Sequence, residues 1–163
     1  MMKRTILILF LLFSFITGFP SCDKNNVTAN NSNTQNNSNT HNNNDSMNSK
    51  IRIKIGSSTF SATLLNNDTA TAFKALLPMT INMVELNGNE KYFNLSANLP
   101  TNTSNPSAIQ TGDLMMYGAN TLVLFYKSFS TSYNYTSLGH IDNTTGLSST
   151  VGDGNVSITF ELL

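Results

Sequence analysis

The segment at residues 112–127 constrains the fold most, because two strongly apolar runs flank one short turn. Residues 114–117 and 122–126 are rich in aromatic and aliphatic side chains, and residues 118–120 between them tolerate turn conformations. The pattern predicts a β-hairpin. Side chains along a strand alternate between its two faces, and both faces of the second run are apolar. We therefore expect a central strand covered on both faces, not an edge strand.

Short strands and one helix are predicted over the rest of residues 50–163. Strict alternation of isoleucines marks the first strand, and Asn87-Gly88 between two β-prone runs is a strong hairpin signal. The additional strands are predicted at 50–55, 59–65, 80–86, 90–95 and 137–141, with a last strand that starts at 152–154 and alternates over 156–162. The helix is predicted at 69–77, and a weak helical turn at 142–150. About eight strands, with a strand at each end of the domain, favour a mainly β protein, a closed antiparallel β-barrel with one or two short helices.

The N-terminal region has the features of an export signal. A positively charged start precedes an apolar run at residues 5–16, which is too short for a comfortable transmembrane helix. Small and turn-forming residues then lead to Cys22, the only cysteine of the chain. This arrangement resembles a bacterial lipobox, in which the signal is cut before a cysteine that is then acylated. It departs from the usual pattern, because Phe19 stands where leucine is common and Pro20 follows.

We therefore predict a lipoprotein-type signal peptide at residues 1–21 and lipid attachment at Cys22. The alternatives are an ordinary cleaved signal that leaves a lone thiol, or an uncleaved anchor. Acyl chains on Cys22 would hold the exported protein on membrane lipid. The expected location is the cell membrane or the outer membrane, and Asp23 does not decide between them because retention rules differ between bacterial groups.

Residues 22–49 are predicted to be a disordered tether. Asn, Ser and Thr dominate this stretch, so there is little to bury against the entropy of ordering the chain. Residues 50–163 are enough for one domain with a real core. The formal net charge of zero argues against a nucleic-acid partner, because such a partner requires a basic face.

The order of the predicted elements resembles the cyclophilin-like fold. Two strands and a helix are followed by Gly112-Asp-Leu, by the run at 122–126 and by Leu138-Gly-His-Ile. The likeness extends over nearly all of residues 50–163, and it is closest to bacterial cyclophilin-like domains of unassigned function. It implies a groove in which Phe125 takes the place of a pocket phenylalanine, Tyr135 falls near a pocket histidine, and Tyr117 lies on the rim.

True cyclophilins are peptidyl-prolyl isomerases, and the resemblance implies where their catalytic arginine should be. That position lies between the helix and the central hairpin, at residues 79–111, and this segment contains no arginine. Arg4 belongs to the signal and Arg52 to the first strand. Loss of a group that stabilises the transition state costs roughly a hundred- to a thousandfold in rate. Proline isomerisation is therefore not expected.

The remaining candidates for chemistry are sparse. His140 is the only histidine of residues 50–163 and is interpreted as a surface strand residue, and Asp113 as a strand-edge hydrogen-bonding residue. No zinc, calcium or phosphate-loop pattern is present, so no metal and no cofactor are expected.

The leading hypothesis is a membrane-tethered, non-enzymatic binding domain with an aromatic groove for an unknown peptide, protein or small molecule. The predicted ligand-binding residues are Tyr117, Phe125, Tyr126 and Tyr135. One alternative is a weak or altered isomerase, or another enzyme that uses the same groove. Another is a surface-display protein, for which Phe125 and Tyr135 should be buried with no cleft beside them.

Overall fold

The computed structural model describes residues 49–163. The predicted signal peptide, Cys22 and nearly all of the predicted tether lie outside these residues. Ten strands and two helices make up the described part. The strands are β1 (Lys50–Ile55), β2 (Ser58–Leu64), β3 (Met79–Leu86), β4 (Glu90–Asn94), β5 (Ala108–Ile109), β6 (Asp113–Tyr117), β7 (Thr121–Phe125), β8 (Phe129–Ser130), β9 (Thr136–Ile141) and β10 (Val156–Leu162), and the helices are α2 (Asp68–Lys74) and α3 (Leu147–Val151).

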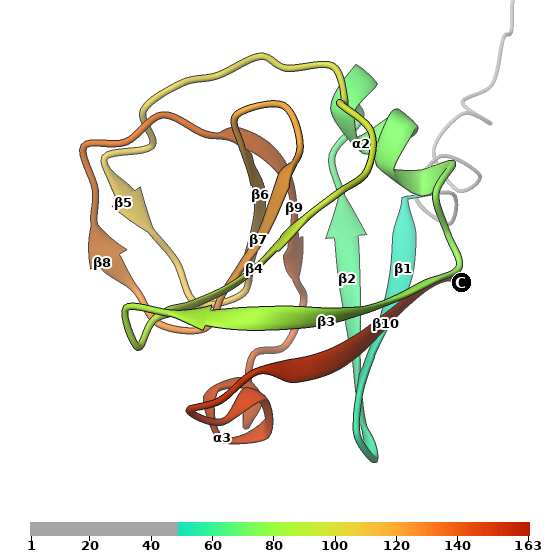
Figure 1. The fold of residues 1–163 in the computed structure, drawn as a ribbon, viewed down its shortest axis with the longest axis vertical. Coiled ribbons are helices and arrows are strands. Elements are labelled where there is room, and N and C mark those ends of the chain that lie inside the picture. The colour runs from blue at the N-terminus through green and yellow to red at the C-terminus, as the bar shows by residue number, and fades with distance from the viewer. Residues whose placement is uncertain (1–48) are drawn as a thin grey trace, which may run out of the picture. The chain divides into compact units, whose positions relative to one another are not determined.

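Eight of the strands close into an antiparallel barrel in the order β1-β10-β3-β4-β7-β6-β9-β2. The barrel is completed where the first strand pairs with the last, with Ile51 opposite Leu162. β7 lies between β4 and β6, as expected for the central strand of the apolar hairpin. The predicted mainly β fold with a closed barrel is confirmed (Figure 1).

The predicted turns and helices form with small shifts. Asn87 and Gly88 both have positive φ, 58° and 70°, the conformation that a tight hairpin turn requires. α2 begins after Asn67, whose side-chain oxygen accepts a hydrogen bond of 2.8 Å from the Ala70 amide. This helix ends at Lys74, earlier than predicted. The predicted helical turn near 142–150 is α3, whose two buried residues pack on the core.

β7 contributes to two separate hydrophobic clusters, one on each of its faces. Leu122 and Leu124 point into the barrel interior, which is filled by a large apolar core. Val123 and Phe125 point outward into a smaller cluster with Ile109, Met115 and Tyr135. The expected coverage of both faces is therefore confirmed.

The outer cluster is covered by two long segments that hold each other in place. β5 and β8 form a two-stranded sheet apart from the barrel (Figure 1). Ser104 and Tyr135 exchange two backbone hydrogen bonds of 2.9 and 3.0 Å. The Asn102 amide also donates to the Thr136 hydroxyl at 3.1 Å. These contacts fix the position of residues 133–135 beside the outer face of β6 and β7.

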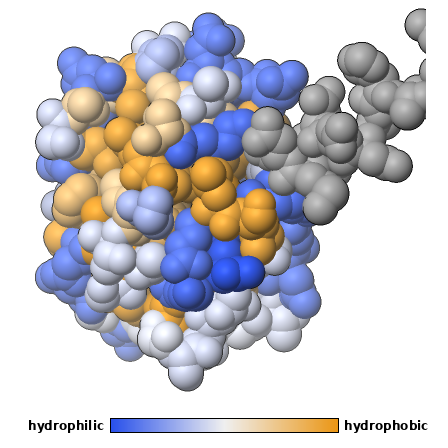
Figure 2. All heavy atoms as spheres, turned by 90° about the vertical axis from the view of Figure 1, so that its right-hand side faces the viewer, coloured by the Kyte–Doolittle hydropathy of each residue, from blue (hydrophilic) through white to orange (hydrophobic). Residues whose placement is uncertain are grey.

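The side of the domain that carries α2 and the C-terminal end of β10 has an apolar surface. Figure 2 shows hydrophobic side chains gathered on this face. Exposed leucines occur at the ends of β2, α2 and β10, namely Leu65, Leu76, Leu162 and Leu163. Neither helix of the described part is long and apolar enough to cross a membrane.

Candidate functional site

A cleft of about 340 Å³ opens on the outer face of β4, β6 and β7. Alternate residues of β4 face it, because the side chains between them point into the barrel. Residues 133–135 form its other side. The lining residues are Leu86, Asn87, Glu90, Tyr92, Asn94, Tyr117, Thr121, Val123, Tyr133 and Tyr135. We call this site the tyrosine cleft.

Four of the five tyrosines of the chain line this one cleft. Tyr133 and Tyr117 stand at the rim with 61% and 48% of their surface exposed, whereas Tyr135 is only 7% exposed. The Tyr117 ring centre lies 6.2 Å from that of Tyr133, at 89°, and 5.7 Å from that of Tyr135. Tyr135 stands edge-on to the buried Phe125 ring at 5.5 Å. An unbroken series of aromatic rings therefore runs from the interior to solvent.

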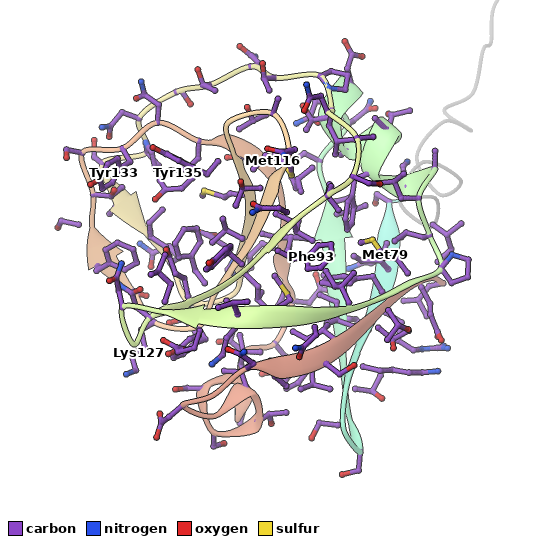
Figure 3. All side chains as sticks on the ribbon, viewed as in Figure 1. Met79, Phe93, Met116, Lys127, Tyr133 and Tyr135 are labelled. Atoms are coloured by element: carbon purple, nitrogen blue, oxygen red, sulfur yellow. The ribbon has the colours of Figure 1, made fainter. Side chains whose placement is uncertain are left out.

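The structure separates the four predicted ligand-binding residues. Tyr117 and Tyr135 line the tyrosine cleft. Phe125 is fully buried beneath Tyr135, where it supports the cleft without lining it. Tyr126 is 2% exposed and belongs to the barrel core. Figure 3 shows Tyr133 and Tyr135 on the side of β5 and β8, away from Phe93 and Met79, which pack against the barrel core.

The cleft bears on the surface-display hypothesis, which expected Phe125 and Tyr135 to be buried with no cleft beside them. Both residues are buried. A cleft nevertheless opens directly beside Tyr135. The second condition of that hypothesis is therefore not met.

Glu90 is a cleft residue that sequence reasoning missed. It lies directly opposite Phe125 in the pairing of β4 with β7. Burial raises the pKa of Glu90, and the negative charge of Glu85 raises it further. The sequence did contain a signal for this placement. Glu90, Tyr92 and Asn94 are alternate residues of one predicted strand, directly after the predicted turn, so their side chains share one face of it.

Lys91, the next residue of β4, points into the end of the barrel and is fully buried. Its ammonium group forms an ion pair with Glu85 and donates to the backbone oxygens of Gly152 and Gly154, each at 2.7 Å. The Nζ atom also lies 5.0 Å from the centre of the Tyr126 ring. The Tyr126 hydroxyl donates to Glu85 at 2.8 Å. We call these residues the Lys91 network.

The Lys91 network holds Glu85 as a carboxylate. Burial alone would raise the pKa of Glu85, but hydrogen bonds from Lys91, Tyr126 and Gly88 outweigh it, and the pKa lies below its usual value. Burial and the hydrogen bond to Glu85 raise the pKa of Tyr126 to about 12. The tyrosine is therefore a neutral donor to a charged acceptor. The ammonium, the carboxylate and the hydroxyl of this network each have a partner inside the protein.

His140 on β9 pairs with Asp113 on β6, and of the two only the histidine is exposed. The Nδ1 atom of His140 lies 2.9 Å from Asp113, and 48% of the histidine side chain is exposed. Asp113 also accepts a hydrogen bond of 2.8 Å from the Gln110 amide. The exposure of His140 matches the surface role expected for it, and the Gln110 contact shows that Asp113 also supports the loop before β6. Within residues 49–163 no three His, Cys, Asp or Glu side chains come together as a metal site.

Fold and site together define a closed antiparallel barrel domain with an aromatic cleft on its outer wall. Residues 53–161 match the model of the cyclophilin-like family, and the chain belongs to that family. The predicted family resemblance is thereby confirmed. The barrel is also similar to the solution structure of a hypothetical protein from Archaeoglobus fulgidus, with a TM-score of 0.51 and 19% identity over 72% of this chain and 97% of that one. A search of curated proteins found no match.

Proposed function

We propose that this chain is an exported, lipid-anchored binding protein whose cyclophilin-like barrel presents the tyrosine cleft to a peptide or a small ligand. The observation that carries the proposal is the concentration of four tyrosines in one cleft, two of them with most or about half of their surface open to solvent. Tyrosine supplies large, rigid contact area with a polar tip at little cost in side-chain entropy. Acylated Cys22 is the proposed attachment to the membrane.

Binding without proline isomerisation fits the position of the domain's arginine. Arg52 lies on β1, where its guanidinium contacts Glu161 of β10 at 3.5 Å. β1 is not a neighbour of β4, β6 or β7 in the barrel order. Arg52 therefore does not supply the electrostatic stabilisation of a twisted amide in the tyrosine cleft.

Ligand binding can be tested through the tyrosines themselves. The chain contains no tryptophan, so tyrosine dominates its intrinsic emission, and four of the five emitters line the cleft. We expect prolyl peptides or members of a metabolite set to change this emission in a saturable manner. The change should be lost in a Tyr117→Ala, Tyr133→Ala double variant that remains folded.

The same samples distinguish binding from catalysis. Catalysed isomerisation of a prolyl peptide by the full chain would favour the alternative of an isomerase and would contradict the non-enzymatic role. Failure of every compound to change tyrosine emission would contradict the binding role itself. Phe125→Ala is a poor test, because truncating a fully buried aromatic costs about 3–5 kcal/mol and endangers the fold.

Membrane attachment is tested separately with Cys22→Ser. Cells grown with labelled palmitate should transfer the label to the native chain and not to the variant, and only the native chain should sediment with membranes. Labelling of the variant, or its unchanged sedimentation with membranes, would contradict lipid attachment at Cys22.

A further inference from the structure

The tyrosine cleft contains a single charged lining residue, Glu90. The other lining residues are tyrosines, aliphatic residues and neutral polar residues. Within residues 49–163, no Lys, Arg or His side chain forms an ion pair with Glu90. Partly buried carboxylates normally have a cation or several hydrogen-bond donors beside them. The cleft therefore contains a negative charge that the described part of the protein does not balance.

The surroundings of Glu90 make this imbalance stronger. Its pKa is raised by burial and by the charge of Glu85, and no hydrogen bond offsets these effects. Its charge in turn adds to the effect of burial in raising the pKa of Tyr135. Glu90 and the tyrosines line the same cleft of about 340 Å³, so one ligand group in the cleft can contact both.

Aromatic rings and a carboxylate both attract cations. The faces of tyrosine rings carry partial negative charge and attract cations, and a carboxylate attracts them more strongly. The Tyr117 and Tyr133 rings stand at 89° to each other and form a corner at the open rim of the cleft. Both cation–π contacts among the described residues are on Tyr126, so no ammonium group of these residues occupies this corner.

We propose that the tyrosine cleft binds an organic ammonium group between the carboxylate of Glu90 and the rings of Tyr117 and Tyr133. This inference rests on the proposed binding function and specifies its ligand class. A volume of about 340 Å³ is near the lower end of ligand pockets and fits one headgroup or one side chain. The ammonium group comes from a small molecule or from a lysine side chain of a peptide, which share the same chemistry.

The test uses the purified full chain in an uncharged glycoside detergent, so that no detergent headgroup competes as a cation. Choline is the small-molecule probe, and its control is the uncharged isostere in which a tert-butyl group replaces the trimethylammonium group. A capped Gly-Lys-Gly peptide is the second probe, and its control carries norleucine in place of lysine. Tyrosine emission and calorimetry measure binding.

Three variants connect binding to Glu90. Glu90→Gln keeps the size of the side chain and removes the charge, and we expect it to weaken binding of the cationic probe at least about tenfold. Glu90→Asp keeps the charge and should retain much of the binding. Glu161→Gln is the matched control, because it removes the same charge on β10, where Glu161 pairs with Arg52 and Lys54. It should bind as the native chain does.

The outcomes separate this inference from the proposed function. Binding of choline but not of its isostere, lost in Glu90→Gln, supports the inference with a small-molecule source; the corresponding result for the lysine peptide supports it with a peptide source. Equal binding of a probe and its uncharged control would overturn the inference and leave the binding role intact. The same holds if neither cation binds while another compound changes tyrosine emission. If no compound changes the emission, both fail.

Discussion

Glu90 and Lys91 are neighbours in sequence and opposites in environment. Lys91 points into the barrel, where Glu85 and two backbone oxygens surround its ammonium group. Glu90 points out into the tyrosine cleft, where no cation among the described residues pairs with it. Removing one partner of a buried ion pair is strongly destabilising, and a charge without partners costs stability unless a ligand balances it. One strand therefore carries a structural charge on one face and a candidate binding charge on the other.

The largest expected effect on stability comes from removing the charge inside the barrel, that of Lys91. Lys91→Met removes the ammonium donor from the oxygens of Gly152 and Gly154 and leaves the Glu85 carboxylate without its cation, although Tyr126 and Gly88 still donate to it. We expect the free energy of unfolding to fall by about 3–5 kcal/mol, measured by urea denaturation. Lys127→Met is the control, because the Lys127 ammonium group also lies over the Tyr126 ring, at 5.5 Å, but this residue is exposed. Its effect should stay within about 0.5 kcal/mol, and equal losses in both variants would contradict the comparison.

A smaller loss is expected from Tyr126→Phe. This change removes one hydrogen bond to the charged Glu85 and keeps the aromatic ring over Lys91. Hydrogen bonds to charged groups contribute about 1.5–3 kcal/mol, so urea denaturation should show a loss in that range. Tyr133→Phe is the control for stability, because it makes the same change at an exposed residue. Because Tyr126 faces the barrel, choline binding should be unchanged in Tyr126→Phe, and lost binding in a folded variant would instead support the direct ligand contact predicted from the sequence.

The two carboxylates should give opposite pH dependence of stability. The folded-state pKa of Glu85 lies below the usual 4.5, so its contribution is present above pH 4.5 and is lost as the pH falls through the folded-state pKa. The folded-state pKa of Glu90 lies above 4.5, so stability falls as the pH rises from 4.5 through that value. The charged group that adds to the effect of burial on the pKa of Glu90 is Glu85.

Urea denaturation across the acidic range checks these signs. Glu85→Gln should reduce the loss of stability in acid, while Glu90→Gln should be slightly more stable than the native chain at neutral pH. Choline binding should weaken as acid protonates Glu90. A Glu90→Gln variant that is less stable than the native chain at neutral pH would show that Glu90 has a structural partner.

The smallest effect is expected at the rim of the cleft. Tyr133→Ala removes an exposed ring, so its cation–π contribution of about 0.5–1 kcal/mol should weaken choline binding only about two- to fivefold. Stability should change by no more than about 0.5 kcal/mol. Leu162→Ala, a similarly exposed residue of β10, should change neither quantity. Calorimetry that shows full binding in Tyr133→Ala would exclude this ring from the site.

The fold could be predicted because its main signals are local. The alternation of residues 50–55 and 156–162, the Asn87-Gly88 turn and the apolar central hairpin each determine one element, and a chain of such strands closes readily into a barrel. The α2 helix was predicted too long. Its last residues use tighter hydrogen bonds, from the Leu76 amide to Phe73 and from the Leu77 amide to Lys74, so the regular helix ends at Lys74.

The site was only partly predictable. Phe125 and Tyr126 are consecutive in an extended segment, so strand alternation alone shows that they cannot both face one groove. The burial of Lys91 depends on backbone oxygens of residues 152 and 154, far along the chain, and no local pattern indicates that. The cleft itself depends on the long-range pairing of Ser104 with Tyr135, which places the tyrosines over β7.

The pairing of β1 with β10 also sets an order of events during synthesis. The first strand of the barrel has the last strand as one of its two partners, so the wall stays open until β10 has left the ribosome. Contacts between such distant segments form late and slowly. A barrel that cannot close before its last strand is made suits the passage through a translocon that the proposed export requires.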